Sequence, residues 1–272
     1  MVYRQIRKAR GPWHDAGALL SWIALAVALI AELAGERWAI GAGLVLFLAG
    51  LAHGAGDENQ GRIRAFSPLH VAAYVLVGFA VAALFLAVPL AGLALFLALS
   101  AWHFARSDIA MAPLTRLAIA GLATGGSALL RHDSTETVFS QVLGYRSPPF
   151  LTDILALVGL AAVGAALFAV FRGRRGSGHA VVALFACAAF HPVLAVGVIF
   201  LTAHAIPIQQ RQIARYGQAA VWRAVGWPTL LAAVGAILLA LGVPHGLIAL
   251  SLAVALAFGM ATPHMLTERL ER

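Results

Sequence analysis

Residues 69–100 read LHVAAYVLVGFAVAALFLAVPLAGLALFLALS and contain no Asp, Glu, Lys or Arg. A helix needs about 20 apolar residues to cross the hydrocarbon layer of a bilayer, so this stretch is long enough for more than one crossing. A second uncharged stretch extends over residues 225–266. A water-soluble fold could not hide so much apolar surface, and the sequence therefore predicts an integral membrane protein.

The composition of the whole chain agrees with a membrane environment. Hydrophobic residues make up 61% and charged residues 11% of the chain, and the mean hydropathy is +0.88, whereas soluble domains contain about 25% charged residues. The net charge of +8 comes from basic residues beside the ends of apolar stretches, as the positive-inside rule describes, and does not indicate nucleic-acid binding. With Cys187 as the single cysteine, any bound metal must have nitrogen or oxygen ligands.

The apolar stretches predict an all-α fold, a polytopic integral membrane helix bundle in which residues 1–272 form a single transmembrane domain of about 8–10 helices. Residues 1–15 are expected to form a cytoplasmic N-terminal segment. The segment 179–190 is short for a full crossing and is expected to be short or re-entrant. The expected spans lie near residues 16–34, 38–53, 69–88, 90–106, 113–130, 150–171, 179–190, 191–206, 227–243 and 246–265.

The basic residues predict the orientation of the chain. A basic segment precedes the first span, and the arginines at 172–175 follow the sixth, so both are expected in the cytoplasm of a multi-pass protein of the cell inner membrane. Pro192 leaves the later topology open, because proline suits a helix start better than a helix interior. If the stretch 179–206 crosses once, the chain has nine spans. If Pro192 divides it, the arginines at 211–223 return to the cytoplasm, and we favour this second topology.

Two histidines near span ends are each followed by an aspartate. His53 stands in the segment HGAGD, which places Asp57 four residues later and on the same face if the helix continues. His103 stands in the segment HFARSD, which places Asp108 five residues later. An imidazole held by a carboxylate is a recurrent arrangement at metal sites. For each histidine alone, the structural alternative is an interaction with the helix dipole or the membrane interface.

Two further histidines, His204 and His264, also stand near span ends, and with a break at Pro192 all four lie toward the cytoplasm. Ionisable groups at membrane depth are costly and usually mark a function. Neutral imidazoles without cysteines suit iron, zinc or copper, and all-histidine sites are compatible with oxygen chemistry on ferrous iron. His132 is expected in a loop on the opposite side, outside this group.

These segments resemble the Brp/Blh family of membrane β-carotene 15,15′-dioxygenases. The segment at 53–57 is similar to the family's His-Gly-Ala-x-Asp motif, and the segment at 103–108 is similar to its His-Phe-Gly-x-x-Asp motif. Further similar blocks occur in family order at 132–139, at 192–204 and at 263–264. Together the blocks cover most of the chain.

The resemblance implies that His53, His103 and His204 bind Fe²⁺. It implies a dioxygenase that inserts both atoms of O2 across the central 15,15′ double bond of β-carotene or a related carotenoid and gives retinal. Asp57 and Asp108 would orient the ligands, and no catalytic group is implied beyond the metal site. The apolar polyene dissolves in the lipid bilayer and could reach a site between helices from the side.

The chain departs from the family pattern at the third motif. The family has a fourth histidine ligand four residues after the third, whereas this chain has Ile208 there, and Glu58 stands where the family has another histidine. His264 or Gln209 could replace the missing ligand. We favour His264, because imidazole binds ferrous iron far better than an amide does.

Two other functions are considered from the sequence. A membrane transporter or proton-relay protein would use His and Asp at helix ends to line a polar path, although the span interiors lack charge and no repeat relates the two halves. A noncatalytic carotenoid- or lipid-binding relative would use the same pocket without the metal.

Overall fold

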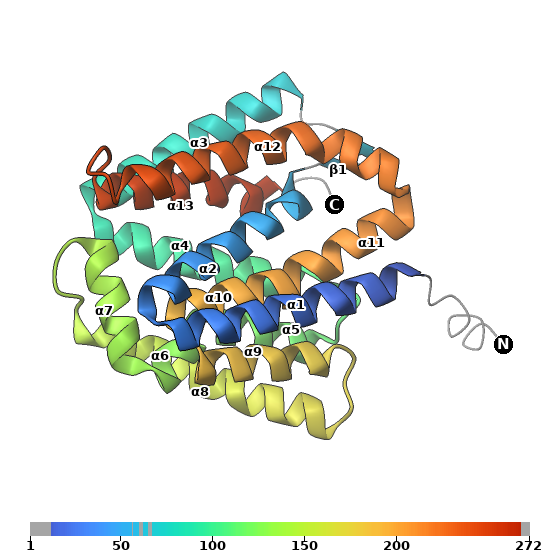
Figure 1. The fold of residues 1–272 in the computed structure, drawn as a ribbon, viewed down its shortest axis with the longest axis horizontal. Coiled ribbons are helices and arrows are strands. Elements are labelled where there is room, and N and C mark those ends of the chain that lie inside the picture. The colour runs from blue at the N-terminus through green and yellow to red at the C-terminus, as the bar shows by residue number, and fades with distance from the viewer. Residues whose placement is uncertain (1–11, 56, 60–61, 65–66, 268–272) are drawn as a thin grey trace.

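The computed structural model describes residues 12–55, 57–59, 62–64 and 67–267, which form a helical bundle with one small β-hairpin (Figure 1). The expected all-α membrane fold is confirmed. Most of the expected segment 1–15 and the last residues of the chain lie outside the described residues. Within the described ranges, seven helices are long and apolar enough to cross a membrane: Ala16–Ala34, Glu36–Gly54, Pro68–Ala87, Pro89–Ser107, Pro149–Phe171, Pro192–Tyr216 and Gln218–Gly242.

The helices follow one another with short connections, and three of the apolar segments contain a non-α turn. The hairpin joins β1 (Asp57–Asn59) to β2 (Arg62–Arg64) in antiparallel register, and one 3₁₀ turn, η3 (Leu51–Gly54), and two π-helical turns, η4 (Leu122–Gly126) and η5 (Phe200–Ala205), continue neighbouring helices. The α-helices are α1 (Pro12–Ala34), α2 (Glu36–Gly50), α3 (Pro68–Ala87), α4 (Pro89–Ser107), α5 (Pro113–Gly121), α6 (Ser127–Leu130), α7 (His132–Leu143), α8 (Pro149–Phe171), α9 (Ser177–Ala189), α10 (Pro192–Ile199), α11 (Ile206–Tyr216), α12 (Gln218–Gly242) and α13 (Leu250–Thr267).

Proline is the first described residue of six of these helices, because its fixed φ suits the first turn and its missing N–H is not needed there. These are α1, α3, α4, α5, α8 and α10. The stretch 179–206 is accordingly two helices: α9 ends at Ala189, and α10 begins at Pro192 with the His191 side chain accepting a hydrogen bond from the Val193 N–H (3.4 Å). The number of membrane crossings and their sidedness stay predictions.

The centre of the bundle contains α2 and α10, which pack closely and run in the same direction (Figure 1). A Cβ atom on Gly43 of α2 would lie 2.8 Å from the Val193 carbonyl oxygen, and one on Gly50 would overlap the Phe200 ring. The later residue of α2, Gly50, thus contacts the later residue of the α10 segment, Phe200. The two helices are therefore parallel, and their C-terminal ends lie at the same end of the bundle.

The helices α4 and α13 also run parallel to each other. Phe96 stacks on Phe258 with ring centroids 3.9 Å apart, and further along the Ser100 hydroxyl donates to the Met265 sulfur (3.8 Å). Their C-terminal ends therefore also gather at one end of the bundle, beside the ends of α2 and α10. This common direction is what positions the candidate site.

At the opposite end of the bundle, a polar cluster connects α1 to Arg131 and to the segment between α9 and α10. The Arg131 guanidinium forms an ion pair with Glu32 of α1 (Nη2–Oε1 2.7 Å) and donates to the Ala189 carbonyl (3.2 Å). The second carboxylate oxygen of Glu32 accepts from the His191 backbone N–H (2.7 Å). The end of α9 and the start of α10, whose backbone groups lack helical partners, are thereby satisfied.

The helix pair formed by α5–η4–α6 and α8 depends on two facing glycines. A Cβ atom on Gly125 would overlap the Leu155 carbonyl oxygen, and one on Gly159 would overlap the Gly125 carbonyl oxygen. Small residues allow this close approach between membrane helices, where packing rather than the hydrophobic effect drives association.

We expect Gly125→Ala to lower the free energy of unfolding by about 1–3 kcal/mol, because the added methyl group forces the two backbones apart. Gly164→Ala on α8 is the matched control, since nothing lies within 4 Å of its Cβ position. The control should be neutral or stabilise the helix by roughly 0.5–1 kcal/mol. Thermal unfolding in detergent measures both, and equal melting temperatures would contradict the proposed close packing.

Candidate metal centre

Four histidines from four separate segments meet where the parallel helices end. His53 lies on η3, His103 near the C-terminal end of α4, His204 on η5 and His264 on the last turn of α13. The first three are buried, with 5%, 4% and 2% of their surface exposed, and His264 is partly buried. The structure thus brings together all four residues that the sequence predicts as metal ligands.

The four imidazoles surround a common point. The Nε2 atom of His204 lies 3.0 Å from that of His103 and 3.1 Å from that of His53, and the Nε2 atom of His264 lies 3.2 Å from that of His53. The rings of His53 and His103 face each other across the group, 6.4 Å apart, while His204 and His264 occupy the two sides at 4.7–4.9 Å from both.

Backbone contact fixes which nitrogen of His53 is available. Its Nδ1 atom lies 2.6 Å from the Gly50 carbonyl oxygen, which can only accept a hydrogen bond. Nδ1 therefore carries the proton, and in the neutral ring Nε2 presents its lone pair to the centre of the group. Metal-binding histidines are commonly held by such a backbone contact on the second nitrogen.

The Nε2 contacts cannot all be hydrogen bonds between neutral rings. Each Nε2 atom carries either one hydrogen or one lone pair, so it has one hydrogen-bond partner. The Nε2 atom of His53 nevertheless contacts those of both His204 and His264, and His204 also contacts His103. A single cation would satisfy this donor set, because it accepts a lone pair from several imidazoles at once.

The spacing of the nitrogens also fits a metal ion. Two imidazole nitrogens bound at about 2.1 Å to one ion and at right angles are about 3.0 Å apart, which matches the 3.0–3.2 Å contacts of the cluster. One nitrogen from each of His53, His103 and His204 lies within 4.8 Å of the others. These residues could hold a metal ion, with imidazole ligands that suit iron, zinc or copper.

Two phenylalanines give the histidine cluster an apolar border. The Phe104 ring lies 4.4 Å from the His204 ring, and the Phe200 ring lies 5.3 Å from the His53 ring between centroids. Phe47 stacks on Phe200 at 5.0 Å and extends this border. The sequence interpretation did not assign these rings a role, although Phe104 directly follows His103 and Phe200 stands four residues before His204.

Gly54 creates the space that His264 occupies. A Cβ atom at position 54 would overlap the His264 ring, so the ring lies directly against the backbone that follows His53. His204 lies on a π-helical turn, a rare geometry that is frequent at functional sites. Neither feature could be recognised from the spacing of the histidines.

Asp57 would share a helix face with His53 only if the helix continued past His53, and this condition is not met. The helical segment ends at Gly54, and Asp57 begins strand β1. The side chains of Asp57 and Glu58 lie outside the part of the chain that the structure describes, so the orienting role of Asp57 stays a prediction.

Asp108 contacts a residue that the sequence interpretation did not include. Its Oδ1 atom accepts from the Arg211 guanidinium (2.8 Å) and from the Ala110 backbone N–H (3.1 Å). Arg211 lies on α11, which continues from the turn that carries His204. This ion pair therefore joins the end of α4 to the helical segment of a second candidate ligand.

Ile208 and Gln209 follow His204 closely in the sequence but contribute no imidazole to the cluster. Ile208 is 2% exposed, so the position that would carry the family's fourth histidine is an apolar core position here. The amide atoms of Gln209 are buried and have no hydrogen-bond partner among the described residues. Of the two suggested replacements, only His264 has its side chain in contact with the other ligands in the described structure.

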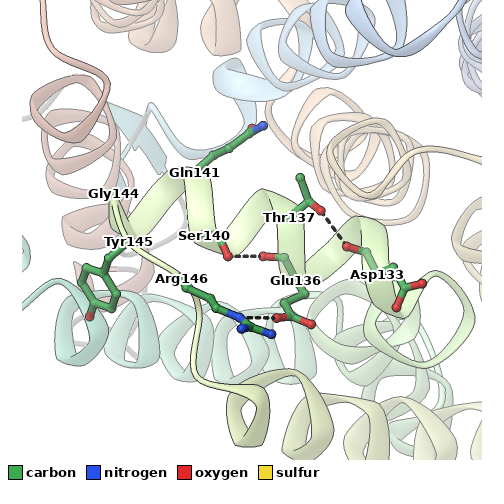
Figure 2. Close-up of a pocket in the computed structure, with 8 residues that line it drawn as sticks. All are labelled: Asp133, Glu136, Thr137, Ser140, Gln141, Gly144, Tyr145 and Arg146. Carbon is green, nitrogen blue, oxygen red and sulfur yellow. Dashed lines mark hydrogen bonds and ion pairs between the residues drawn. The ribbon is translucent and has the colours of Figure 1, made fainter.

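His132 does not lie in a loop, as expected from the sequence, but begins α7. Its Nε2 atom lies 3.3 Å from Asp153, away from the four-histidine cluster. The adjoining surface of α7 forms a groove of about 700 Å³, and Figure 2 shows that its polar lining residues belong to α7 and the turn after it. A second cavity, also of about 700 Å³, lies beside the Asp108–Arg211 pair and reaches α1 and α9.

An apolar helical bundle whose parallel helix ends gather four imidazoles belongs to the class of multi-pass membrane proteins with clustered histidines that could hold a metal ion. Comparison with protein families gives a match to the beta-carotene 15,15′-dioxygenase family over residues 44–270. The chain belongs to this family, which confirms the resemblance seen in its motifs. Comparisons with curated proteins and with solved structures gave no match.

We expect His264→Ala to weaken metal binding at least about tenfold, because losing an imidazole should cost no less than losing a residue that orients one. His245→Ala is the matched control, since His245 is exposed in the connection between α12 and α13. Metal analysis of the purified proteins measures the effect. Equal metal content in His264→Ala and wild type would remove His264 from the ligand set.

Gly54→Ala should reduce metal content in the same direction, because the added methyl group displaces the His264 ring. Gly41→Ala on α2 is its control, since no atom lies within 4 Å of that Cβ position. The ratio of metal to protein should fall for Gly54→Ala and stay at the wild-type value for Gly41→Ala. An unchanged ratio in both variants would show that His264 does not depend on Gly54.

Proposed function

We propose that the protein is an iron-dependent carotenoid oxygenase that cleaves β-carotene or a related carotenoid at the central 15,15′ double bond with O2 and gives retinal. The observation that carries the proposal is the convergence of His53, His103, His204 and His264 on one point among apolar helix ends. Family membership supports the general reaction type. An all-imidazole donor set suits ferrous iron.

Within this proposal the four histidines would hold the iron, which when bound supplies the activation of O2 for the reaction. The chain's own residues keep the centre in shape and limit its exposure to water. Gly50 holds His53 in the tautomer that presents Nε2, and Phe104 and Phe200 border the imidazoles with apolar rings. No described side chain needs to donate or accept a proton, which agrees with an oxygenation that transfers none.

The proposed substrate also fits the surroundings of the centre. A carotenoid is a long apolar polyene that dissolves in the bilayer, and the helices around the histidines are apolar along most of their length. The polyene could therefore reach the centre from the lipid side, between helices, without passing through water. The aromatic border formed by Phe104 and Phe200 suits contact with a conjugated chain.

We further propose that the metal-site end of the bundle faces the cytoplasm in the cell inner membrane. The Ala112 backbone N–H, close after the end of α4, donates to the Arg175 carbonyl (3.1 Å), so the arginines at 172–175 lie at this same end. Arg211 and Arg215 on α11 follow His204 there. Basic residues beside span ends favour the cytoplasmic side.

Expression in a β-carotene-accumulating bacterium tests the reaction. We expect the wild-type protein to lower β-carotene and to produce retinal, both measured by chromatography. His53→Ala and His103→Ala should produce no retinal above background, because each removes a buried ligand. His245→Ala should retain wild-type production.

Well-expressed wild-type protein that leaves β-carotene undiminished and forms no retinal would refute the enzyme assignment. If such a protein nevertheless copurifies with carotenoid but without iron, the noncatalytic binding function replaces it. Retinal formation that persists in His53→Ala and His103→Ala would separate the reaction from the histidine cluster.

A further inference from the structure

Arg211 ties the end of the His103 helix to the helix of His204. Its Nη1 atom donates to Asp108 Oδ1 (2.8 Å), and its Nη2 atom donates to the backbone carbonyl of Ser107 (3.4 Å). Ser107 is the last residue of α4, and its hydroxyl in turn donates to the His103 carbonyl (2.5 Å). One guanidinium thus contacts both the terminal carbonyl of α4 and the carboxylate that follows it.

Gln212, the next residue on α11, makes the corresponding contact to the third ligand segment. Its Nε2 atom donates to the backbone carbonyl of His53 (3.1 Å), and its side chain is buried. Adjacent residues on a helix point about 100° apart, so a single turn can reach two neighbouring segments. Arg211 reaches α4, and Gln212 reaches η3.

These contacts lie at helix ends, where the backbone is least ordered. The last four carbonyls of a helix have no intrahelical partner, and helix ends fray unless other groups satisfy them. His53 lies in the last turn of its segment, and His103 lies four residues before Ser107, the last residue of α4. Without an external donor, the backbone that carries each imidazole would have more freedom than a metal site tolerates.

We propose that Arg211 and Gln212 are positioning residues that hold the His103 and His53 imidazoles at metal-binding distance from His204. This inference rests on the proposed function, because it assumes a metal ion on the histidines. The two side chains act through the backbone of α4 and η3 and do not contact the metal. The helical segment 200–216 then carries one ligand and anchors the segments of two others.

A merely structural tie would lower thermal stability without changing the ligand geometry. The geometry itself can be followed with Co²⁺, whose visible absorption depends on the number and arrangement of its ligands. The experiment uses the purified full chain in detergent, depleted of metal and titrated with Co²⁺. Affinity and absorption spectrum are recorded together with the melting temperature of the metal-free protein.

We expect Arg211→Met and Gln212→Leu to weaken Co²⁺ binding by about 10–100-fold, the usual effect of losing a residue that orients a ligand, and to change the absorption spectrum. Arg211→Lys should fall between these variants and wild type, because an ammonium group can pair with Asp108 but cannot form the two-pronged contact with the Ser107 carbonyl as well. Arg215→Met removes the same charge from an exposed position on the same helix and should match wild type.

Wild-type affinity and spectrum in Arg211→Met and Gln212→Leu, with only the melting temperatures lowered, would overturn the positioning role. If Arg211→Met fails to fold, Arg211→Lys and Gln212→Leu decide, and unchanged Co²⁺ binding in both overturns the proposal. Wild-type protein that binds no Co²⁺, or binds it equally well as His53→Ala, would instead refute the metal centre itself. The two failures are therefore distinguishable.

Discussion

The arrangement depends on four imidazole rings that gather around one point in a low-dielectric interior. Nε2 contacts of 3.0–3.2 Å exceed what hydrogen bonding between neutral rings can satisfy, and one shared cation could satisfy them together. Bringing these nitrogens together requires α2, α4, α10 and α13 to end at the same end of the bundle. The glycines between α2 and α10 permit that convergence, because they let the backbones approach closely. The polar cluster around Glu32 and Arg131 stabilises the other end of the bundle, away from the four histidines.

The fold class and the set of converging histidines could be predicted from the sequence, because both follow from one-dimensional patterns. Uncharged runs identify helices in lipid, and His53, His103, His204 and His264 all stand near the ends of such runs. Whether they meet depends on helix directions, which charge patterns indicated but did not establish. The contact of His264 with the others further depends on the missing side chain of Gly54, and nothing in the local sequence relates two residues so far apart.

The expectation for Asp57 rested on a local rule, helical spacing, that does not hold past a helix end. Asp57 was placed by helical spacing, but the helix ends at Gly54 and the chain turns into a hairpin. The side chain of Asp108 is described by the structure and pairs with Arg211. Its spacing from His103 in the sequence did not indicate this partner. Arg211 and Gln212 could not be recognised because their partners lie more than 100 residues away in the sequence, and two of their three contacts go to backbone carbonyls, which leave no trace in residue identity.

The position of His264 on the last described helix has a consequence for biosynthesis. Its side chain completes a group whose other members come from η3, α4 and η5, so nearly all described helices must be inserted and packed before the fourth imidazole arrives. A nascent chain in which α13 has not yet been synthesised can present at most three of the rings. The complete group of four imidazoles can therefore form only after translation has passed α13.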